Sequence, residues 1–262
     1  QRGDVKLRVS AVRAIGNLKA KNLEEQMKQL LLSQAPNEVR TEAVRILGRG
    51  DSGCAILLEL EQAGQLPAEL RNVASGVTNA SPSAAIRGRA KRLLPPVVSK
   101  NRKPWPPIRE LLAREGDAER GKKLFTAVAG PKCGSCHSLD ESKKALGPNL
   151  AQIGDKLGKE ALFDSILNPS AGIAPEYYVW RLQTKTEGIV VGIITEDTAQ
   201  RVTVLTDATT DLRFKPSDVV ARKRSHLSLM PEDLANTMTE QQMVDLLAFL
   251  GTLKKETKSA SK

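Results

Sequence analysis

The chain has 262 residues, of which 40 % are hydrophobic and 27 % charged, a composition that excludes disorder over most of its length and suffices for two domains with cores of their own. The formal net charge of +10 falls almost entirely in residues 1–104, which hold 18 Lys and Arg but nine Asp and Glu. These cations recur at helical spacing without interleaved aromatic residues, so we expect a solvated helix face and no nucleic-acid partner. No apolar run approaches the ~20 residues of a membrane span, and because the chain opens on Gln1 we expect its original start to have been removed.

Three pentads with the pattern aliphatic residue, Arg, two variable positions and Ala recur in the first part of the chain. They are residues 7–11, 39–43 and 70–74, spaced 32 and 31 residues apart, and the apolar positions around them fit amphipathic helices. Helical repeats of this length stack because one helix pair cannot bury its own apolar stripe. The pattern resembles HEAT repeats, so we expect an α-solenoid over residues 1–98.

Proline interrupts the helical pattern after this region. Pro95-Pro96 and Lys103-Pro104-Trp105-Pro106-Pro107 cannot continue a helix, because proline lacks the amide donor and biases the residue before it toward extended backbone. We therefore predict a linker over residues 99–116, in which Trp105 packs onto one of the domains. A second domain is predicted over residues 117–254.

Helical patterns return in the second domain. Residues 117–129 and 159–167 are predicted to be helices, and Thr239 followed three residues later by Gln242 forms a capping box before a final apolar stripe. We therefore predict a last helix that begins at Thr239. The Lys- and Ser-rich residues 255–262 are expected to be a disordered tail.

A different periodicity runs from Tyr177 to about Arg224. Apolar and polar side chains alternate there, β-branched residues are frequent, and turn-forming residues separate the runs. We predict four or five short strands that form a small sheet or barrel, inserted at about residues 176–224. The predicted fold class is therefore mainly α, a HEAT-like solenoid followed by a helical domain with a small β insertion.

The strongest local signal is Cys133-Gly134-Ser135-Cys136-His137. Two thiols at this spacing can each add to one vinyl group of haem, and His137 can then reach the iron on the same face of the ring. A thioredoxin-like redox pair needs a preceding strand, and a zinc site needs a second pair of ligands that the sequence lacks. We therefore predict one covalently bound haem c, with Cys133 and Cys136 as attachment residues and His137 as an iron ligand.

The flanking residues resemble class I cytochromes c, so the second domain is expected to be a helical domain of that kind. Gly121 and Phe125 stand like the Gly and the aromatic residue of their first helix, which packs against the final helix. Gly147-Pro148-Asn149-Leu150 is similar to their loop after the haem motif, and the resemblance implies that the Pro148 carbonyl accepts the ring N–H of the ligating His. An ordinary turn proline is the alternative for Pro148.

The sixth iron ligand is expected to be a Met or the remaining His. Met230 is favoured because it stands between the β pattern and the last helix, where class I cytochromes place a loop Met. Met243 and Met238 lie in or next to the last helix, and Met27 lies in the first domain. His226 is the alternative, and a Met ligand would imply a higher reduction potential than a second imidazole.

The ordered set of motifs resembles the haem-binding domain family described from planctomycetes and verrucomicrobia, over about residues 117–254. The resemblance implies His137 and Met230 as axial ligands and a position after HEAT-like repeats. Besides the haem motif and its loop, it rests on Ile166-Leu167-Asn168-Pro169-Ser170, Ala174-Pro175-Glu176-Tyr177, Ser228-Leu229-Met230-Pro231 and Leu246-Leu247-Ala248-Phe249-Leu250.

Together these features predict an electron-transfer module without catalytic activity of its own, because no paired base and nucleophile are evident. The expected partners are an oxidoreductase, such as a dehydrogenase, as electron donor and another cytochrome or a terminal oxidase as acceptor. Covalent haem attachment normally takes place outside the cytoplasm, so we expect a periplasmic protein. Two alternatives are a haem sensor or peroxidase whose Met230 dissociates, and a scaffold whose basic solenoid binds an acidic partner.

Overall fold

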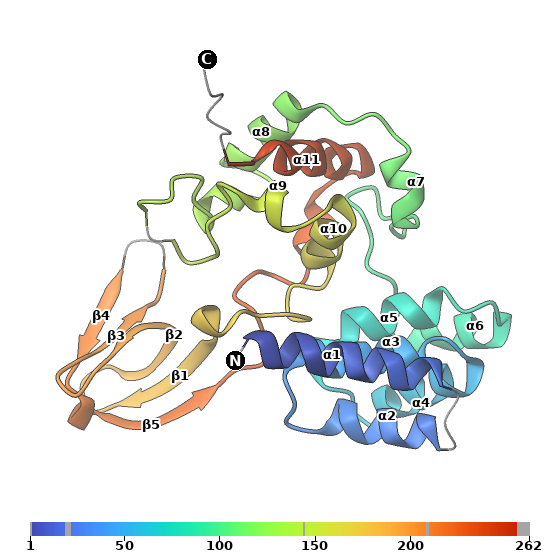
Figure 1. Ribbon diagram of the computed structural model, residues 1–262, viewed down its shortest axis with the longest axis horizontal. Helices are drawn as coiled ribbons and strands as arrows, with labels where there is room; N and C mark the ends of the chain where they lie inside the picture. The colour runs from blue at the N-terminus through green and yellow to red at the C-terminus, as the bar shows by residue number, and fades with distance from the viewer. Residues whose placement is uncertain (1, 19–21, 144, 208–209, 256–262) are drawn as a thin grey trace, which may run out of the picture. The chain divides into compact units, whose positions relative to one another are not determined.

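The protein divides into two compact units in a computed structural model that describes residues 2–18, 22–143, 145–207 and 210–255 (Figure 1). The N-terminal unit comprises Gln1–Val97 together with Leu167–Ile173, and the C-terminal unit comprises Val98–Ile166 and Ala174–Lys262. The chain therefore contributes to the N-terminal unit a second time, from within the sequence of the C-terminal unit.

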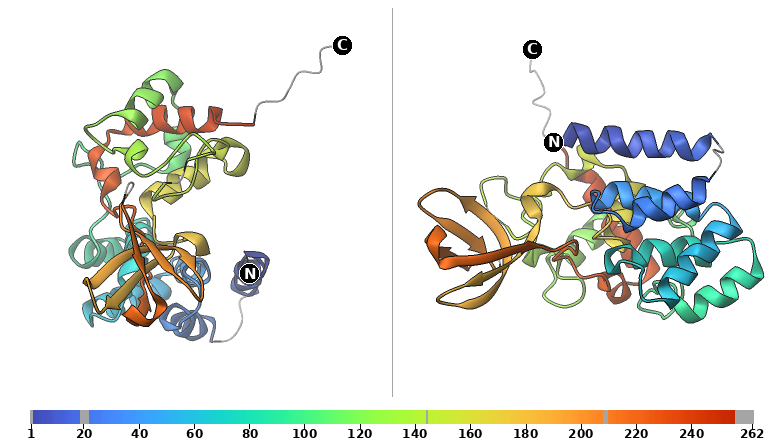
Figure 2. Two further views of the ribbon diagram at one scale, coloured as in Figure 1. Left: turned by 90° about the vertical axis from the view of Figure 1, so that its left-hand side faces the viewer. Right: turned by 90° about the horizontal axis from the view of Figure 1, so that it is seen from below.

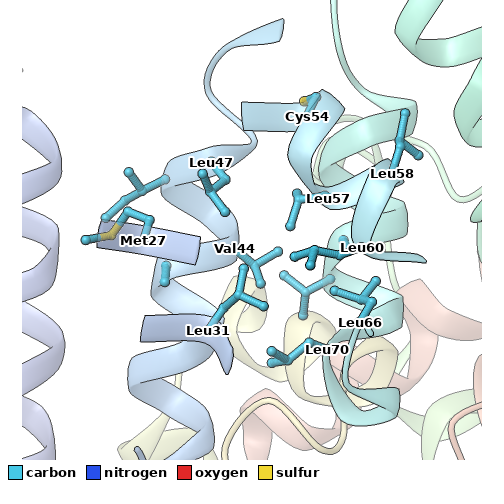
Figure 3. Packing of buried hydrophobic residues seen from close by; sticks show 14 of the residues in the cluster. Met27, Leu31, Val44, Leu47, Cys54, Leu57, Leu58, Leu60, Leu66 and Leu70 are labelled. Atoms are coloured by element: carbon cyan, nitrogen blue, oxygen red, sulfur yellow. The ribbon is translucent and has the colours of Figure 1, made fainter. Parts of the chain in front are cut away.

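The N-terminal unit is helical in its described part. Its helices bury one apolar core, in which Leu31, Leu57 and Leu70 are fully buried (Figure 3). Full burial of one such side chain contributes ~1.5–3 kcal/mol, so this unit has a hydrophobic core of its own. The elements are α1 (Arg2–Asn17), α2 (Leu23–Leu32), α3 (Asn37–Leu47), α4 (Asp51–Gln62), the 3-10 turn η1 (Ala68–Leu70), α5 (Arg71–Asn79) and α6 (Ala84–Leu93).

The segment Leu167–Ile173 is held in this unit through its backbone. Asn37 Nδ2 of α3 donates to the Ser170 carbonyl at 2.8 Å. Asn72 Nδ2 of α5 donates to the Leu167 carbonyl at 3.0 Å. Side-chain donors of two helices thus take the place of backbone pairing in this segment.

The helices α8 (Ala118–Thr126) and α11 (Glu240–Thr252) pack against each other in the C-terminal unit. Gly121 approaches α11 so closely that a Cβ there would lie 2.1 Å from the Asp245 carbonyl oxygen. One turn further along α8, the rings of Phe125 and Phe249 meet with centroids 5.7 Å apart. Only glycine at position 121 allows the two backbones to come this close.

A buried carboxylate joins the same two helices. Asp245 accepts hydrogen bonds from the Asp117 backbone N–H at 2.9 Å, from Arg120 Nε at 2.7 Å and from Gln241 Nε2 at 3.0 Å. Burial alone would raise the pKa of Asp245, but the hydrogen bonds from Arg120, Asp117 and Gln241 outweigh it, so the pKa lies below its ordinary value. The ionised carboxylate therefore fixes the start of α8 on α11.

The helix α11 begins at a capping box. The capping box predicted at Thr239 is confirmed, because Thr239 Oγ1 accepts the Gln242 N–H at 3.2 Å and Gln242 Oε1 accepts the Thr239 N–H at 2.9 Å. None of the described helices is long and apolar enough to cross a lipid bilayer. The helix predicted at residues 159–167 is confirmed as α10 (Lys159–Leu167). The remaining helical elements of this unit are short, namely α7 (Ile108–Leu112), η2 (Cys133–Ser135), α9 (Ile153–Lys156), η3 (Pro175–Tyr177), η4 (Pro216–Asp218) and η5 (Leu234–Thr237).

A five-stranded antiparallel sheet, in the order β4-β3-β2-β1-β5, completes the C-terminal unit (Figure 2). The predicted alternation holds on β1, where Leu182 is fully buried while Arg181 and Gln183 are exposed. Leu182 packs with Val190 and Val204, so one face of the sheet buries an apolar cluster. The strands are β1 (Val179–Thr184), β2 (Gly188–Asp197), β3 (Val202–Leu205), β4 (Asp211–Phe214) and β5 (Val219–Arg224).

The prediction of a mainly α fold is wrong. Helices make up 50 % and strands 13 % of the structure, and the five-stranded sheet makes it a mixed α and β fold. The arrangement establishes neither a helical solenoid over residues 1–98 nor a cytochrome c fold over residues 117–254. The physical reason is that the β-branched stretch pairs into a sheet with its own apolar cluster. Apart from Lys255, the predicted tail at residues 255–262 lies outside the described residues.

Gly121→Ala is expected to lower the free energy of unfolding by about 1–3 kcal/mol, because the added Cβ must push α8 away from the backbone of α11. The matched control is Gly88→Ala in α6, where a Cβ meets open space. That control should be neutral or stabilising by ~0.5–1 kcal/mol. Urea unfolding measured by circular dichroism compares the two, and equal effects would contradict the close contact at Gly121.

Asp245→Asn is expected to cost about 1–3 kcal/mol at neutral pH, because Arg120 retains its exposed ion pair with Asp117 but loses the buried Asp245 carboxylate. Folding lowers the pKa of Asp245, so its stabilising contribution is present above the pKa of unfolded Asp, about 3.9, and is lost as the pH falls through the folded-state value. The difference in unfolding free energy between wild type and variant should therefore shrink below about pH 4. Urea unfolding across a pH series measures it, and a difference that does not change with pH would sink the assignment.

Candidate functional site

The Cys133–His137 motif follows α8 as a tight turn. Its first three residues form η2, and Lys132 before them has a left-handed backbone with φ of 50°. The N–H groups of Cys136 and His137 both donate to the Cys133 carbonyl, at 3.2 and 3.0 Å. The turn therefore gathers both thiols and the imidazole within a single loop of backbone.

Both cysteines of the motif are half-buried free thiols. Burial raises the pKa of the Cys133 thiol to about 11, with a backbone hydrogen bond opposing part of the effect. A redox-active Cys pair relies on a thiolate with a lowered pKa, and this motif follows a helix where a thioredoxin-like site has a strand. The local chemistry thus disfavours a dithiol redox centre. Cys54 lies apart from it, buried in the core of the N-terminal unit.

The imidazole of His137 is oriented by a backbone acceptor. Its Nδ1 lies 2.8 Å from the Pro148 carbonyl oxygen, so the resemblance-based expectation for Pro148 matches a contact that is present. Burial lowers the pKa of His137, and the hydrogen bond to Pro148 opposes part of that shift. A neutral imidazole whose Nδ1–H donates to Pro148 has its lone pair on Nε2, which is the form that can bind a metal.

The loop that carries Pro148 is closed onto the motif by backbone hydrogen bonds. The Gly147 N–H donates to the Cys136 carbonyl at 2.7 Å. A Cβ at Gly147 would lie 2.6 Å from His137 Cε1, so the loop packs directly on the imidazole ring. Asn149 Nδ2 supports the loop by donating to the Asp140 carbonyl at 2.7 Å. The sequence showed Gly147 and Asn149 as parts of a motif but not these contacts, which arise only when the loop folds back.

Met230, the favoured sixth ligand, lies between β5 and η5 and is half-buried. Among the described residues it is not part of the hydrogen-bonded cluster around His137, and its own N–H donates to Ser228 Oγ at 3.1 Å. His226 is half-buried in the same segment and remains the alternative. The thioethers of the other methionines are at most 3 % exposed in packed cores, namely Met27, Met238 and Met243.

Residues 118–202 match the model of the Cytochrome c family. The matched range contains the Cys133–His137 motif and Pro148, and it ends at the first residue of β3, before Met230. No curated protein matches the chain. The match indicates a cytochrome c domain at residues 118–202, and this family implies a covalently bound c-type haem with its iron. Domains of this family typically work outside the cytoplasm.

The residues present fit this cofactor. Cys133 and Cys136 offer two unoxidised thiols for thioether bonds, and His137 offers Nε2 because Pro148 holds Nδ1. Across the described parts of the chain, no group of three or more His, Cys, Asp or Glu side chains gathers as a metal site, so a zinc centre at these cysteines lacks its remaining ligands.

Gly147→Ala is expected to turn the His137 imidazole and weaken its hydrogen bond to Pro148, since a Cβ there would overlap the ring. A less strongly hydrogen-bonded imidazole is a poorer donor to ferric iron, so the reduction potential should rise, by ~59 mV for each tenfold change in the equilibrium. Gly158→Ala is the matched control, because a Cβ there meets open space. Spectroelectrochemical titration measures both, and an unchanged potential in Gly147→Ala would rule out this steric role.

Proposed function

We propose that the C-terminal unit is an electron-transfer module whose haem is attached at Cys133 and Cys136 and ligated by His137 and Met230. The observation that carries this proposal is the 2.8 Å contact between His137 Nδ1 and the Pro148 carbonyl, which presents Nε2 as a metal ligand. A bound c-type haem supplies one-electron chemistry between ferric and ferrous iron. The sequence contains this motif once, among three cysteines, which supports a single haem.

Pro148 and Met230 would both influence the reduction potential of the haem, in different ways. The Pro148 carbonyl fixes the imidazole orientation and raises its basicity, while a Met230 thioether favours the ferrous state relative to a second imidazole. Met230 is supported over the other methionines because its side chain is half-buried in a loop and theirs fill packed cores. With both axial positions filled, no iron position stays open for a substrate, which favours electron transfer over a peroxidase or a gas sensor.

The partners and the compartment follow from this proposal. The electron donor is an oxidoreductase, such as a dehydrogenase on a separate or fused chain, and the acceptor is another cytochrome or a terminal oxidase. Because haem is normally attached covalently outside the cytoplasm, we assign the protein to the periplasm. The order of motifs along residues 117–254 supports membership of the planctomycete and verrucomicrobial type of haem-binding domain.

Met230→Ala is expected to abolish the Met-to-iron charge-transfer band of the ferric protein and to lower the reduction potential by on the order of 100 mV, because a thioether ligand is lost. His226→Ala is the control and should leave both the band and the potential unchanged. The reverse pattern would identify His226 as the ligand. Carbon monoxide binding to the ferrous wild type would contradict a six-coordinate electron carrier.

A further inference from the structure

One face of the five-stranded sheet is covered at one end and exposed at the other. The strands β2, β1 and β5 lie side by side (Figure 1), and residues directly opposite each other on neighbouring strands point to the same face. In one row of this face Val179 lies opposite Ile193, and each is only 4 % exposed. Val191 in the next row is 47 % exposed, and Ile189 in the row after it is 56 % exposed. The apolar strip along β2 thus continues from a buried row into solvent.

Two cations stand directly opposite each other on the exposed part of this face. The register places Arg181 of β1 between Val191 of β2 and Lys223 of β5. Both cations are exposed, and among the described residues no side chain pairs with either of them. Like charges directly opposite on neighbouring strands destabilise a sheet. The sheet therefore bears an electrostatic cost here that a neutral residue at either position would avoid.

The neighbouring cations of β5 have partners within the sheet and differ in this from the opposed pair. Arg222 Nη1 lies 2.6 Å from Asp197 Oδ2, and the Arg224 guanidinium lies 4.5 Å from the centre of the Tyr178 ring. Residues 105–262 hold 22 Lys and Arg and 21 Asp and Glu, so this part of the chain has little basic excess. The opposed cations are therefore a local feature of this face.

The two exposed rows together form what we call the docking face. Its residues are Arg181, Val191 and Lys223 in one row and Gln183, Ile189 and Ala221 in the next. We propose that the docking face binds an acidic protein partner, which presents carboxylates to the two cations and apolar side chains to the two β-branched residues. An exposed apolar patch with a polar rim is typical of an interaction site. A carboxylate bound between the cations would also relieve their repulsion.

Two other occupants fit the docking face less well. A second copy of the chain would set the same cations against each other, because a symmetric contact repeats one patch on both sides. A membrane would bury the Gln183 amide among acyl chains that cannot pair it, and none of the residues of the face is one of the aromatic anchors of interfacial binding. A protein surface can satisfy the amide as well as the charges. The inference involves no iron ligand, so it does not depend on the proposed function.

The test measures binding of a fluorescent helical peptide to the haem-loaded full chain by anisotropy. The peptide carries Glu and Leu side by side on one face, and a second peptide with Gln in place of Glu is its control. The acidic peptide should bind, and binding should weaken in about 1 M NaCl, where the Debye length is ~3 Å. Arg181→Glu with Lys223→Glu should weaken it about tenfold or more, and Ile189→Ser with Val191→Ser about threefold or more. The matched control, Lys156→Glu with Lys159→Glu, reverses two exposed cations outside the sheet and should leave binding unchanged.

A second measurement separates docking from folding. Arg181→Glu alone places opposite charges across β1 and β5, so it should raise the urea midpoint of unfolding while it weakens binding of the acidic peptide. Equal binding of the two peptides to the wild type, or equal losses in the charge-reversed pair and its control, would overturn the proposal. Two further results would replace the partner. Binding to phosphatidylglycerol vesicles that needs Arg181 and Lys223, without binding of the peptide, would indicate a membrane, and a dimer that dissociates in Ile189→Ser with Val191→Ser would indicate a second copy.

Discussion

The hydrogen bond between His137 and the Pro148 carbonyl decides which nitrogen of the imidazole can face a metal. With Nδ1 paired at 2.8 Å, the ring has one orientation and one tautomer, and Nε2 is the remaining ligand atom. The loop achieves this by closing onto the motif through the Gly147 N–H and by bringing Gly147 against the ring. A different loop conformation would leave the same Cys-Xaa-Xaa-Cys-His residues without a directed ligand.

That loop conformation depends in turn on the packing of α8 and α11. The motif begins at Cys133, seven residues after α8 ends at Thr126, so the position of α8 limits where this turn can form. Gly121 allows the two backbones to approach, and Asp245 holds the start of α8 through Asp117 and Arg120. The orientation of the His137 imidazole therefore depends on the contact between α8 and α11 as well as on its own loop.

Local signals in the sequence were sufficient for part of this structure. The haem motif, the capping box at Thr239 and the helix at residues 159–167 each depend on neighbours a few residues apart, so the sequence alone predicts them. The predicted fold class, mainly α, was wrong. Alternation within each strand does not reveal that five strands share one apolar cluster and form a substantial part of the fold.

Contacts between distant segments could not be predicted. The hydrogen bonds from Asn37 and Asn72 to the segment Leu167–Ile173 join residues 133 and 95 positions apart, and no local pattern marks them as partners. Asp245 had a readable signal, since a carboxylate inside an apolar stripe demands a partner.

Ligation of the iron by Met230 can be observed directly in the proton spectrum of the ferrous, haem-loaded protein with labelled methionine methyl groups. The chain has four methionines, and we expect one methyl resonance that is shifted far upfield by the haem ring current and is absent from Met230→Ala. Four unshifted methyl resonances, or an upfield resonance that survives in Met230→Ala, would contradict His137 and Met230 as the axial pair.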